Sequence, residues 1–294
     1  MDADSVPFIK PVDFLDIEDY KKTGCHFFRD RETLEQFPDV FKKIFYNLFP
    51  RDIETVLFGI PQLTPHTLEN KFFKHNARHF VESGIVLMDR KSHLLGMLMS
   101  IHLQFWGPLN TFLYGEKEIF WLGQSIAGNE QYSYNINPVG AIGPITTSEH
   151  KIADSAISVQ PAHIGSDNHT LLWVNSGLET CKRHSWTHDF KNNRKLNKEF
   201  GSEDNLKNHY LSPLQIDGVI IPPDATRYYD NKINEPKRGW EQRSDLGCEG
   251  YLWAAYSNVG DDKNGARGKE VRFSEDEKKY YNKIASIWTS ELDE

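Results

Sequence analysis

Residues 84–105 read GIVLMDRKSHLLGMLMSIHLQF, and this stretch decides the fold class. Gly84 to Met88 is an apolar run of the kind found in a buried strand. Ser92 to Phe105 then reads as an amphipathic helix whose apolar stripe contains Leu94, Leu95, Leu98, Ile101, His102 and Phe105. A strand followed by a helix is one layered unit, so the sequence predicts an α/β fold.

Shorter elements extend outward from this unit on both sides. The pattern of apolar and turn residues predicts helices at 13–22, 38–48, 116–127 and 249–256. It predicts short strands at 155–159, 171–174 and 219–221. Polar segments without apolar periodicity predict loops at 162–168, 191–208 and 260–268.

The C-terminal helix has the clearest start signal in the chain. Ser274 and Glu277 make a capping box, in which each side chain bonds to the backbone N–H of the other residue. Beyond it, one apolar face is formed by Tyr281, Ile284, Trp288 and Leu292.

Composition narrows the function classes. The 294 residues are 38% hydrophobic and 13% aromatic, enough for the core of one large domain or two small ones. A formal net charge of −8 and a pI near 5.9 argue against a general nucleic-acid binder, because phosphate binding needs a basic surface. No stretch approaches the ~20 apolar residues of a spanning helix, and no signal segment opens the sequence.

The cysteines and one glycosylation motif bear on the compartment. Cys25, Cys181 and Cys248 are too few for a zinc cluster and allow at most one disulfide. An odd count fits a cytosolic chain of buried thiols, or a secretory chain with one bridge and one free thiol. Asn168-His169-Thr170 is the only N-glycosylation sequon, which fits a lumenal protein, although such tripeptides also arise by chance.

Two carboxylates stand at the start of the segment Met1-Asp2-Ala3-Asp4-Ser5-Val6-Pro7-Phe8. Alternate side chains of an extended segment share one face, so Asp2 and Asp4 can reach the same hard divalent cation. Many sugar-nucleotide transferases use an Asp-x-Asp in this way, because the metal neutralises the departing nucleoside diphosphate. Manganese and magnesium both suit such ligands. The alternative is a frayed terminus without a ligand.

Three further segments accompany the Asp-x-Asp in order: Thr23-Gly24-Cys25-His26-Phe27-Phe28-Arg29-Asp30-Arg31, Val81-Glu82-Ser83-Gly84-Ile85-Val86-Leu87-Met88-Asp89 and Tyr114-Gly115-Glu116-Lys117-Glu118-Ile119-Phe120-Trp121. In order and spacing they resemble the fungal Golgi α-mannosyltransferases, most closely the α-1,3-mannosyltransferase branch of glycosyltransferase family 71. The likeness covers residues 2 to about 190 well and the remainder loosely. One departure is Glu116, where the family usually has Gly-Asp-Lys-Glu.

The resemblance implies a GT-A-like glycosyltransferase fold, of which this chain is the C-terminal portion beginning at the Asp-x-Asp motif. In the family an N-terminal half carries a membrane anchor, a stem and the first nucleotide-binding strands, so we expect an N-terminally truncated catalytic domain. Residues 1–190 would form the metal, donor and acceptor core, 191–208 an exposed loop, and 209–294 a C-terminal α/β extension. The implied location is the Golgi membrane, with a lumenal catalytic domain.

Two of the segments supply candidate substrate contacts. Arg29 and Arg31 flank Asp30, so one arginine could face a donor phosphate and the other Asp30; the alternative is a surface ion-pair cluster. Glu82, Ser83 and Gly84 lie where the chain enters the predicted strand. There they are candidates for contact with mannose, with Gly84 permitting close backbone approach, and the alternative is a cap.

The third segment supplies the candidate catalytic carboxylates. A retaining transferase needs a carboxylate near the anomeric carbon, as nucleophile or to stabilise an oxocarbenium-like transition state. The resemblance favours Glu118 or Glu116 as that group or as an acceptor contact, although acids near a helix N-terminus are expected in any protein. Trp121 could stack on a sugar or belong to the core.

Other GT-A enzymes draw a third metal ligand from a histidine in a comparable C-terminal place, which makes His163 the candidate here. Asp167 is a less favoured neighbour. The alternative is that His163 is one of 12 histidines with structural roles.

We therefore predict a retaining mannosyltransferase that moves mannose from GDP-mannose to a mannose of an N- or O-linked glycan in α-1,3 linkage. Mn²⁺ is the expected cofactor, with Mg²⁺ as the alternative. Expected partners are the donor, a mannose-containing acceptor and other Golgi transferases, but not nucleic acid. The alternatives are an α-1,2-mannosyltransferase of the same superfamily, or an inactive remnant that binds glycan or a partner transferase.

Overall fold

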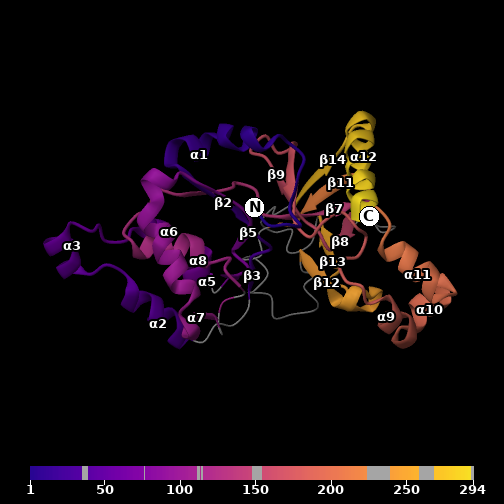
Figure 1. Ribbon diagram of the computed structural model, residues 1–294, viewed down its shortest axis with the longest axis horizontal. Helices are drawn as coiled ribbons and strands as arrows, with labels where there is room; N and C mark the ends of the chain where they lie inside the picture. The colour runs from indigo at the N-terminus through magenta and orange to yellow at the C-terminus, as the bar shows by residue number, and fades with distance from the viewer. Residues whose placement is uncertain are drawn as a thin grey trace, which may run out of the picture. The chain divides into compact units, whose positions relative to one another are not determined.

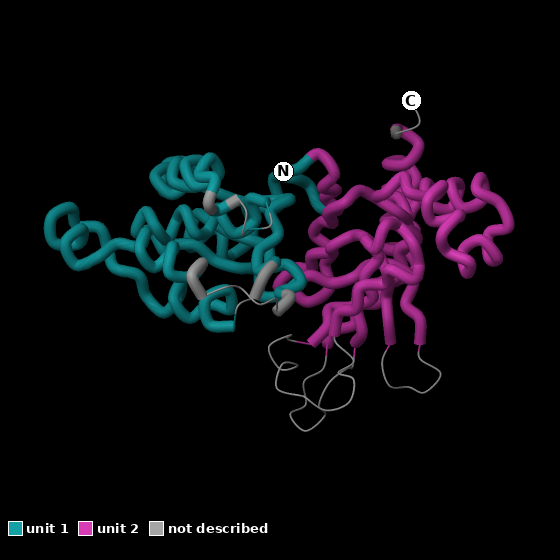
Figure 2. The backbone as a smooth tube through the Cα atoms, turned by 90° about the horizontal axis from the view of Figure 1, so that it is seen from below, with its two compact units in different colours: residues 1–2, 9–138 teal, residues 3–8, 139–294 magenta. Residues whose placement is uncertain are grey.

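The computed structural model describes residues 1–294 except 35–38, 76, 111–112, 114, 148–153, 224–238, 258–267 and 293–294. It is a mixed α/β structure with two compact units (Figure 2). Unit 1 contains residues 1–2 and 9–138, and unit 2 contains residues 3–8 and 139–294. The boundary near residue 139 differs from the sequence-based division at residue 190.

Unit 1 is a small sheet surrounded by helices (Figure 1). Its three-stranded sheet has the order β5-β2-β6, and a two-stranded sheet pairs β3 with β4. The strands are β2 (Cys25–Arg29), β3 (Thr33–Leu34), β4 (Ala77–Arg78), β5 (Val81–Met88) and β6 (Ser133–Tyr134). The helices are η1 (Pro11–Asp16), α1 (Glu18–Thr23), α2 (Asp39–Leu48), α3 (Asp52–Phe58), α4 (Pro65–Leu68), α5 (Lys71–His75), α6 (Arg90–Gln104), α7 (Gly107–Asn110) and α8 (Ile119–Ile126).

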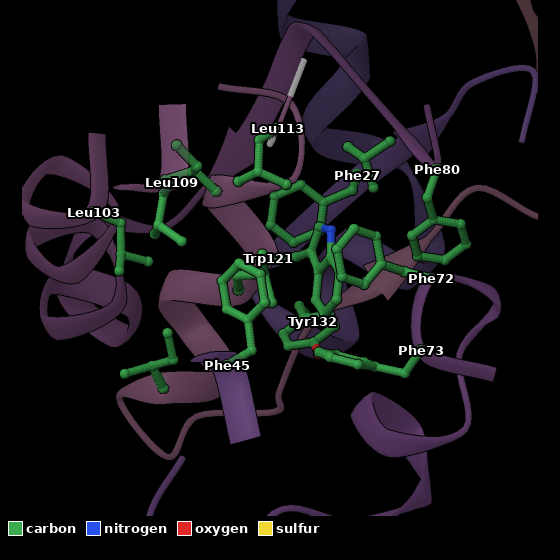
Figure 3. Packing of buried hydrophobic residues seen from close by; sticks show 14 of the residues in the cluster. Phe27, Phe45, Phe72, Phe73, Phe80, Leu103, Leu109, Leu113, Trp121 and Tyr132 are labelled. Carbon is green, nitrogen blue, oxygen red and sulfur yellow. The ribbon is translucent and has the colours of Figure 1, made fainter. Parts of the chain in front are cut away.

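The core of unit 1 is aromatic. Trp121 of α8 is fully buried, and rings from several elements meet it edge to face, with the Phe72 ring centroid 5.4 Å away (Figure 3). The same cluster contains Phe27, Phe45, Phe73, Phe80 and Tyr132. Burial of such large apolar surfaces is the main stabilising contribution available to a unit with so short a sheet.

Unit 2 has three layers. Its six-stranded antiparallel sheet has the order β1-β10-β9-β7-β11-β14, and a second sheet has the order β12-β13-β8. The strands are β1 (Val6–Pro7), β7 (Gly140–Gly143), β8 (Ser155–Ser158), β9 (Pro161–Ile164), β10 (Leu171–Val174), β11 (Gly218–Ile221), β12 (Trp240–Gln242), β13 (Trp253–Tyr256) and β14 (Lys269–Arg272). The helices are α9 (Trp186–Asn192), α10 (Arg194–Phe200), α11 (Glu203–Tyr210), η3 (Ser244–Leu246), η4 (Cys248–Gly250) and α12 (Glu275–Leu292).

Alternation along the strands explains the layers of unit 2. Ile142 and Val219 point to the face where Tyr281 and Ala285 of α12 pack, whereas Ala141 and Ile220 pack on Ala156 and Ala255 of the second sheet. Successive strand residues face opposite sides, so each strand serves two cores. The capping box predicted for α12 is confirmed, because the Ser274 hydroxyl and Glu277 make the reciprocal bonds. Tyr281, Ile284 and Trp288 of the predicted apolar face pack on the sheet, whereas the side chain of Leu292 lies outside what the structure describes.

Several expected elements are confirmed. Strands occur at β8, β10 and β11, and helices at α2, α6 and α8, close to the expected limits. The predicted helix at 13–22 is instead a 3-10 turn followed by α1. Pro38, expected to begin α2, and residues 260–267 of an expected loop lie outside the described residues.

Three sequence-based predictions were wrong. Residues 191–208 are not a loop, because Asn193 and Ser202 cap α10 and α11, whose Leu196 and Leu206 are buried. Residues 249–256 are not a helix, since Trp253–Tyr256 pairs with strands on both sides as β13. The expected loop at 162–168 begins with β9, which is paired on both sides with β10 and β7.

Helix α6 occurs where expected, but its apolar stripe faces outward. Leu95 is 71% and Phe105 83% exposed, whereas His93, Gly96, Ser100 and Leu103 are buried. The inner face packs on α8, where a Cβ on Gly123 would lie 2.7 Å from the backbone oxygen of Gly96. Small residues therefore set the packing, because only they allow the two backbones to approach so closely.

Among the described residues, no helix combines the length and apolar character needed to cross a bilayer.

Candidate functional site

The Glu82-Ser83-Gly84 segment lies in an irregularity of the β2–β5 pair. Phe27 pairs with Val86, but the next residue, Phe28, pairs with Glu82. Residues 83–85 of β5 therefore form a bulge in the pairing with β2. Such bulges re-aim side chains and are common beside functional sites. The backbone oxygen of Gly84 accepts a hydrogen bond of 2.8 Å from the N–H of Asp2. Two of the motifs therefore meet at this bulge.

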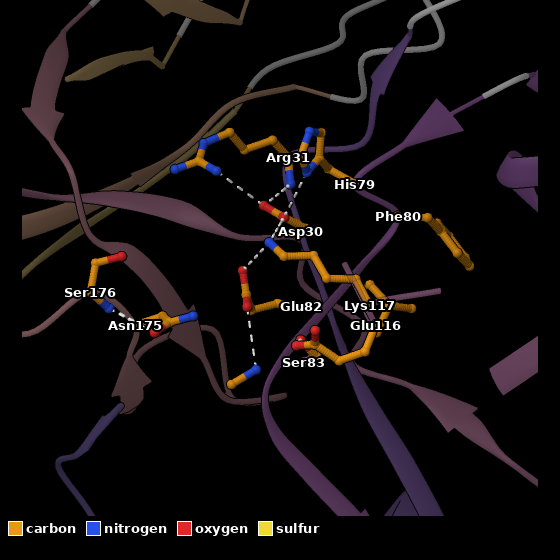
Figure 4. Close-up of polar contacts among 12 residues, drawn as sticks. Asp30, Arg31, His79, Phe80, Glu82, Ser83, Glu116, Lys117, Asn175 and Ser176 are labelled. Atoms are coloured by element: carbon orange, nitrogen blue, oxygen red, sulfur yellow. Dashed lines mark hydrogen bonds and ion pairs between the residues drawn. The ribbon is translucent and has the colours of Figure 1, made fainter. Parts of the chain in front are cut away.

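Lys117 joins the other motifs through a buried ion-pair cluster (Figure 4). Its Nζ lies 2.7 Å from Oδ2 of Asp30 and 2.8 Å from Oε2 of Glu82, and both carboxylates are at most 1% exposed. On the other side of Asp30, Oδ1 accepts a 2.7 Å bond from the N–H of Arg31, whose Nη1 lies 3.4 Å away. We call Asp30, Arg31, Glu82 and Lys117 the Lys117 cluster.

Asp30 and Lys117 are both charged at neutral pH. Burial alone would raise the pKa of Asp30, but the positive charges of Lys117 and Arg31 outweigh it and hold that pKa well below its usual range. Burial would lower the pKa of Lys117, whereas Asp30 and Glu82 raise it above its ordinary value. A cation held by Asp30, which follows β2, and Glu82 of β5 fixes the positions of these two segments relative to each other.

Glu32, another buried carboxylate, pairs with Arg29. Glu32 is 3% exposed and forms ion pairs with Arg29 and with Lys71, whose Nζ lies 2.5 Å from Oε2. Arg29 also donates a 3.0 Å bond to the backbone oxygen of Ile136. Arg29 thus contacts Glu32, and Arg31 contacts Asp30, within the same turn. Both arginine side chains are mostly buried, so these ion pairs do not form a surface cluster. A phosphate contact for either arginine stays a prediction.

Buried Ser83 is hydrogen-bonded to Glu116, which is only partly buried. The Ser83 hydroxyl donates a 2.8 Å hydrogen bond to Oε1 of Glu116. Glu116 is half-buried, whereas Asp30, Glu82 and Glu118 are buried. Of Asp30, Glu82, Glu116 and Glu118, Glu116 is therefore the carboxylate most accessible to a sugar in solvent.

Glu118 is enclosed by N–H donors. Oε1 accepts a 2.7 Å bond from the N–H of Phe80, and Oε2 accepts one of 2.7 Å from Nε1 of Trp121. Burial raises the pKa of Glu118 to about 7, although the bonds from Trp121 and Phe80 act in the opposite direction. The catalytic role of Glu118 stays a prediction. Sugar stacking by Trp121 also stays a prediction, and the burial of its ring does not favour it.

The three expected metal ligands have different surroundings. Asp2 belongs to unit 1 and Asp4 to unit 2, where the Asp4 carboxylate lies 2.8 Å from Lys182 Nζ. His163 is fully buried on β9 and stacks on Trp173 with ring centroids 4.1 Å apart. The Asp167 carboxylate accepts bonds from the N–H groups of His169 and Thr170.

Across the residues that the structure describes, no group of three or more His, Cys, Asp or Glu side chains is arranged to hold a metal ion. A ligand role for His163 stays a prediction, and its stacked, enclosed ring does not favour it.

Sequence reasoning missed Lys117 and Asp30 as members of the site. Both lie inside the quoted segments, but Asp30 was expected only as the partner of an arginine, and Lys117 was given no role. The available signal was that Lys117 lies two residues before a strongly apolar helix. A charge at the edge of a buried element needs a buried partner.

All the residues that converge on this site lie within residues 1–165, which match a family model described as "Mannosyltransferase putative". The chain belongs to this mannosyltransferase family. A Candida albicans protein named "Putative alpha-1,3-mannosyltransferase MNN14" is 34% identical over 98% of this chain and 44% of that protein. "Alpha-1,3-mannosyltransferase MNT2" of Saccharomyces cerevisiae is 32% identical over 99% of this chain and 51% of that protein.

These comparisons confirm the resemblance to fungal α-1,3-mannosyltransferases. The chain spans about half or less of the length of these mannosyltransferase relatives. Their shared region includes every candidate residue of the site, since almost the whole chain is aligned.

Proposed function

We propose that the chain carries the sugar-handling part of a retaining α-1,3-mannosyltransferase, with a GT-A-like fold, that moves mannose from GDP-mannose to a mannose of an N- or O-linked glycan. The observation that carries the proposal is the convergence of all four motifs. Asp2 bonds to the bulge at Gly84, and Lys117 ties that bulge to Asp30. Separate segments that meet around a half-buried carboxylate are what a sugar site requires.

In this proposal Glu116 contacts the sugar and Lys117 is a positioning residue. Ser83 orients the Glu116 carboxylate through the 2.8 Å hydrogen bond. Lys117 holds Glu82, and with it the bulge, at a fixed place relative to Asp30. Glu118 fixes the backbone at Phe80 and the Trp121 ring, which supports the core beneath the site.

Asp2 and Asp4 would hold the Mn²⁺ or Mg²⁺. Their carboxylate oxygens are the ligands that a hard cation prefers. Phosphate and water can supply the other ligands, because Asp2 is exposed and the Asp4 side chain is 39% exposed. When bound, the ion would neutralise charge on the leaving diphosphate. The proposal places the protein in the Golgi lumen, alongside other transferases of that compartment. The Cys181–Cys248 disulfide supports an oxidising compartment.

The test is a transfer assay with labelled GDP-mannose, a mannose-terminated oligosaccharide and Mn²⁺. We expect transfer from GDP-mannose and none from UDP-sugars, and a product that an α-1,3-specific mannosidase cleaves. Asp2→Asn and Asp4→Asn should each lower kcat by 100-fold or more, about 2.7 kcal/mol or more of transition-state stabilisation. Asp13→Asn, an exposed acid of η1, is the matched control and should have no effect.

Undiminished turnover in the two aspartate variants would contradict the metal assignment. A product resistant to the α-1,3 enzyme but cleaved by an α-1,2-specific mannosidase would instead favour the α-1,2 alternative.

The same assay distinguishes the two candidate carboxylates. Glu116→Gln should lower kcat without changing the melting temperature, because the side chain is only partly buried. Glu118→Gln should lower the melting temperature, because it disturbs a buried set of hydrogen bonds. A Glu118→Gln protein of unchanged stability and much reduced kcat would make Glu118 the catalytic group.

A further inference from the structure

The sequon Asn168-His169-Thr170 has no part in the proposed transfer site, yet the structure displays it at the surface of unit 2. It lies in the connection between β9 and β10, two antiparallel neighbours in the six-stranded sheet. Asn168 is exposed, and so are Ser166 and Asp167 before it and His169 after it. An acceptor asparagine must be presented in this way if the folded protein is to carry a bulky glycan.

The turn is held without the Asn168 side-chain nitrogen. The N–H of Asn168 donates a 3.0 Å bond to the backbone oxygen of Gly165, and Asp167 accepts bonds from the N–H groups of His169 and Thr170. Asn168 has a φ of 62°, a left-handed conformation that asparagine tolerates better than most residues.

The carboxamide of Asn168 is oriented by its oxygen. Lys269 Nζ donates a 2.5 Å hydrogen bond to Oδ1. A substituent on Nδ2 would leave this bond intact, because Oδ1 stays an acceptor when the amide nitrogen is substituted. The folded turn can therefore carry a group on Nδ2 without losing an interaction seen in the structure.

An independent observation bears on the compartment. Cys181 and Cys248 of the same unit form a disulfide across 67 residues of sequence. Structural disulfides form in oxidising compartments such as the lumen of the endoplasmic reticulum, where N-linked oligosaccharides are also added. The bridge thus places unit 2 where the sequon can be used, without reference to the mannosyl-transfer chemistry.

We propose that Asn168 is an N-glycosylation site of this protein. The donor is an oligosaccharide linked through pyrophosphate to a lipid. Nδ2 of Asn168 forms a bond to C1 of the first sugar, the bond from C1 to the phosphate oxygen breaks, the lipid pyrophosphate leaves, and Nδ2 loses one proton. The sugar then projects from the β9–β10 turn into solvent.

The experiment is translation of the whole chain behind a cleavable signal sequence in the presence of microsomes. We expect one glycan on the protease-protected wild-type chain, seen as a single mobility shift that endoglycosidase H removes. Asn168→Asp should abolish the shift while keeping an oxygen that accepts from Lys269. Thr170→Val should also abolish it, and Thr170→Ser should retain it, because the motif requires a hydroxyl at this position.

A protected wild-type chain without the shift would overturn the proposal, as would a shift that survives in Asn168→Asp. The folding control is the Cys181–Cys248 bridge, read by non-reducing electrophoresis. It should form equally in wild type and Asn168→Asp, so a missing shift cannot be attributed to a misfolded chain.

Discussion

Lys117 is the residue that connects the motifs of this protein. It is the cation between Asp30 and Glu82, whose carboxylates are almost completely buried. Removing one member of such a group leaves an uncompensated charge away from water, which costs far more than the pair itself contributes. The position of the bulge at Gly84 therefore depends on a side chain 33 positions further along the chain.

We expect Lys117→Met to lower the free energy of unfolding by about 3–5 kcal/mol, because two buried carboxylates lose their partner. Urea denaturation measures this, with Lys91→Met on the exposed face of α6 as the control, expected to change stability by less than about 0.5 kcal/mol. Adding Asp30→Asn to Lys117→Met should restore part of the loss. The control is additivity. If Asp30→Asn destabilises the Lys117→Met variant by as much as it destabilises the wild type, the two residues are not coupled.

Glu118 makes unit 1 sensitive to pH. Its folded pKa of about 7 lies above the ordinary value of 4.5, so the folded state binds the proton more tightly than the unfolded state. This contribution to stability is fully present below pH 4.5 and is lost as the pH rises through 7. The loss amounts to roughly 3 kcal/mol at 1.36 kcal/mol per pKa unit.

We expect the slope of unfolding free energy against pH between 4.5 and 7 to be flatter in Glu118→Gln than in wild type. A direct readout is the indole N–H resonance of Trp121, which donates to Glu118 and should titrate with a midpoint near pH 7. The resonance of an indole that does not contact a carboxyl group serves as the control. A Trp121 resonance that is constant from pH 5 to 8 would contradict the raised pKa.

At the scale of elements, helix α6 shows how close packing overrides an apolar stripe. The stripe containing Leu95 and Phe105 faces solvent, because Gly96 and Ser100 on the other side fit against Gly123 and Gln124 of α8. Two helices in such close contact gain dispersion energy along their whole interface. Exposed leucines, by contrast, are common on protein surfaces.

Gly123→Ala should therefore destabilise unit 1 by about 1–3 kcal/mol, because the new methyl group would meet the backbone of α6. Thermal denaturation can compare it with Gly107→Ala, where a Cβ meets nothing within 4 Å and stability should stay equal or rise. Leu98→Glu, on the exposed stripe, should change stability by less than about 0.5 kcal/mol. A large loss for Leu98→Glu together with none for Gly123→Ala would mean that α6 packs through its apolar stripe.

At the scale of the molecule, the two units have separate cores, and the disulfide lies within unit 2. Unit 2 contains the disulfide, which fastens the segment before α9 to η4 beside the buried side chains of Leu196, Leu206 and Tyr210. Unit 1 contains Cys25 as a buried free thiol. The three cysteines thus form one bridge and leave one free thiol.

Replacing Cys181 and Cys248 together by serine should destabilise unit 2 by about 2–5 kcal/mol. Hydrogen exchange followed by mass spectrometry should show faster exchange in peptides from α9 to α11, with peptides from α8 unchanged. Cys25→Ala is the matched control. It should speed exchange in peptides from α8 and leave those from α9 to α11 unchanged, because Cys25 packs in the core of unit 1. Equal acceleration in both units after loss of the bridge would show that they unfold as one.

The sequence by itself determined the elements with strong local signals. The apolar run of β5, the strand β10 and the capped helix α12 could be predicted because their hydrogen bonds or their periodicity depend on neighbouring residues. It also determined the family, because the order of four motifs is a property of the sequence alone. Of the candidate site, it identified the segments and the candidate residues Glu82, Glu116 and Glu118.

Only the tertiary structure decided which of those residues meet. The inward face of α6 depends on α8, and residues 253–256 form a strand because β8 and β12 lie on either side. The pairing of Lys117 with Asp30 spans 87 positions, and neither residue signals the other in sequence. A buried charge is stable only when a partner is brought to it through space, so its role is determined by the fold and not by the local sequence.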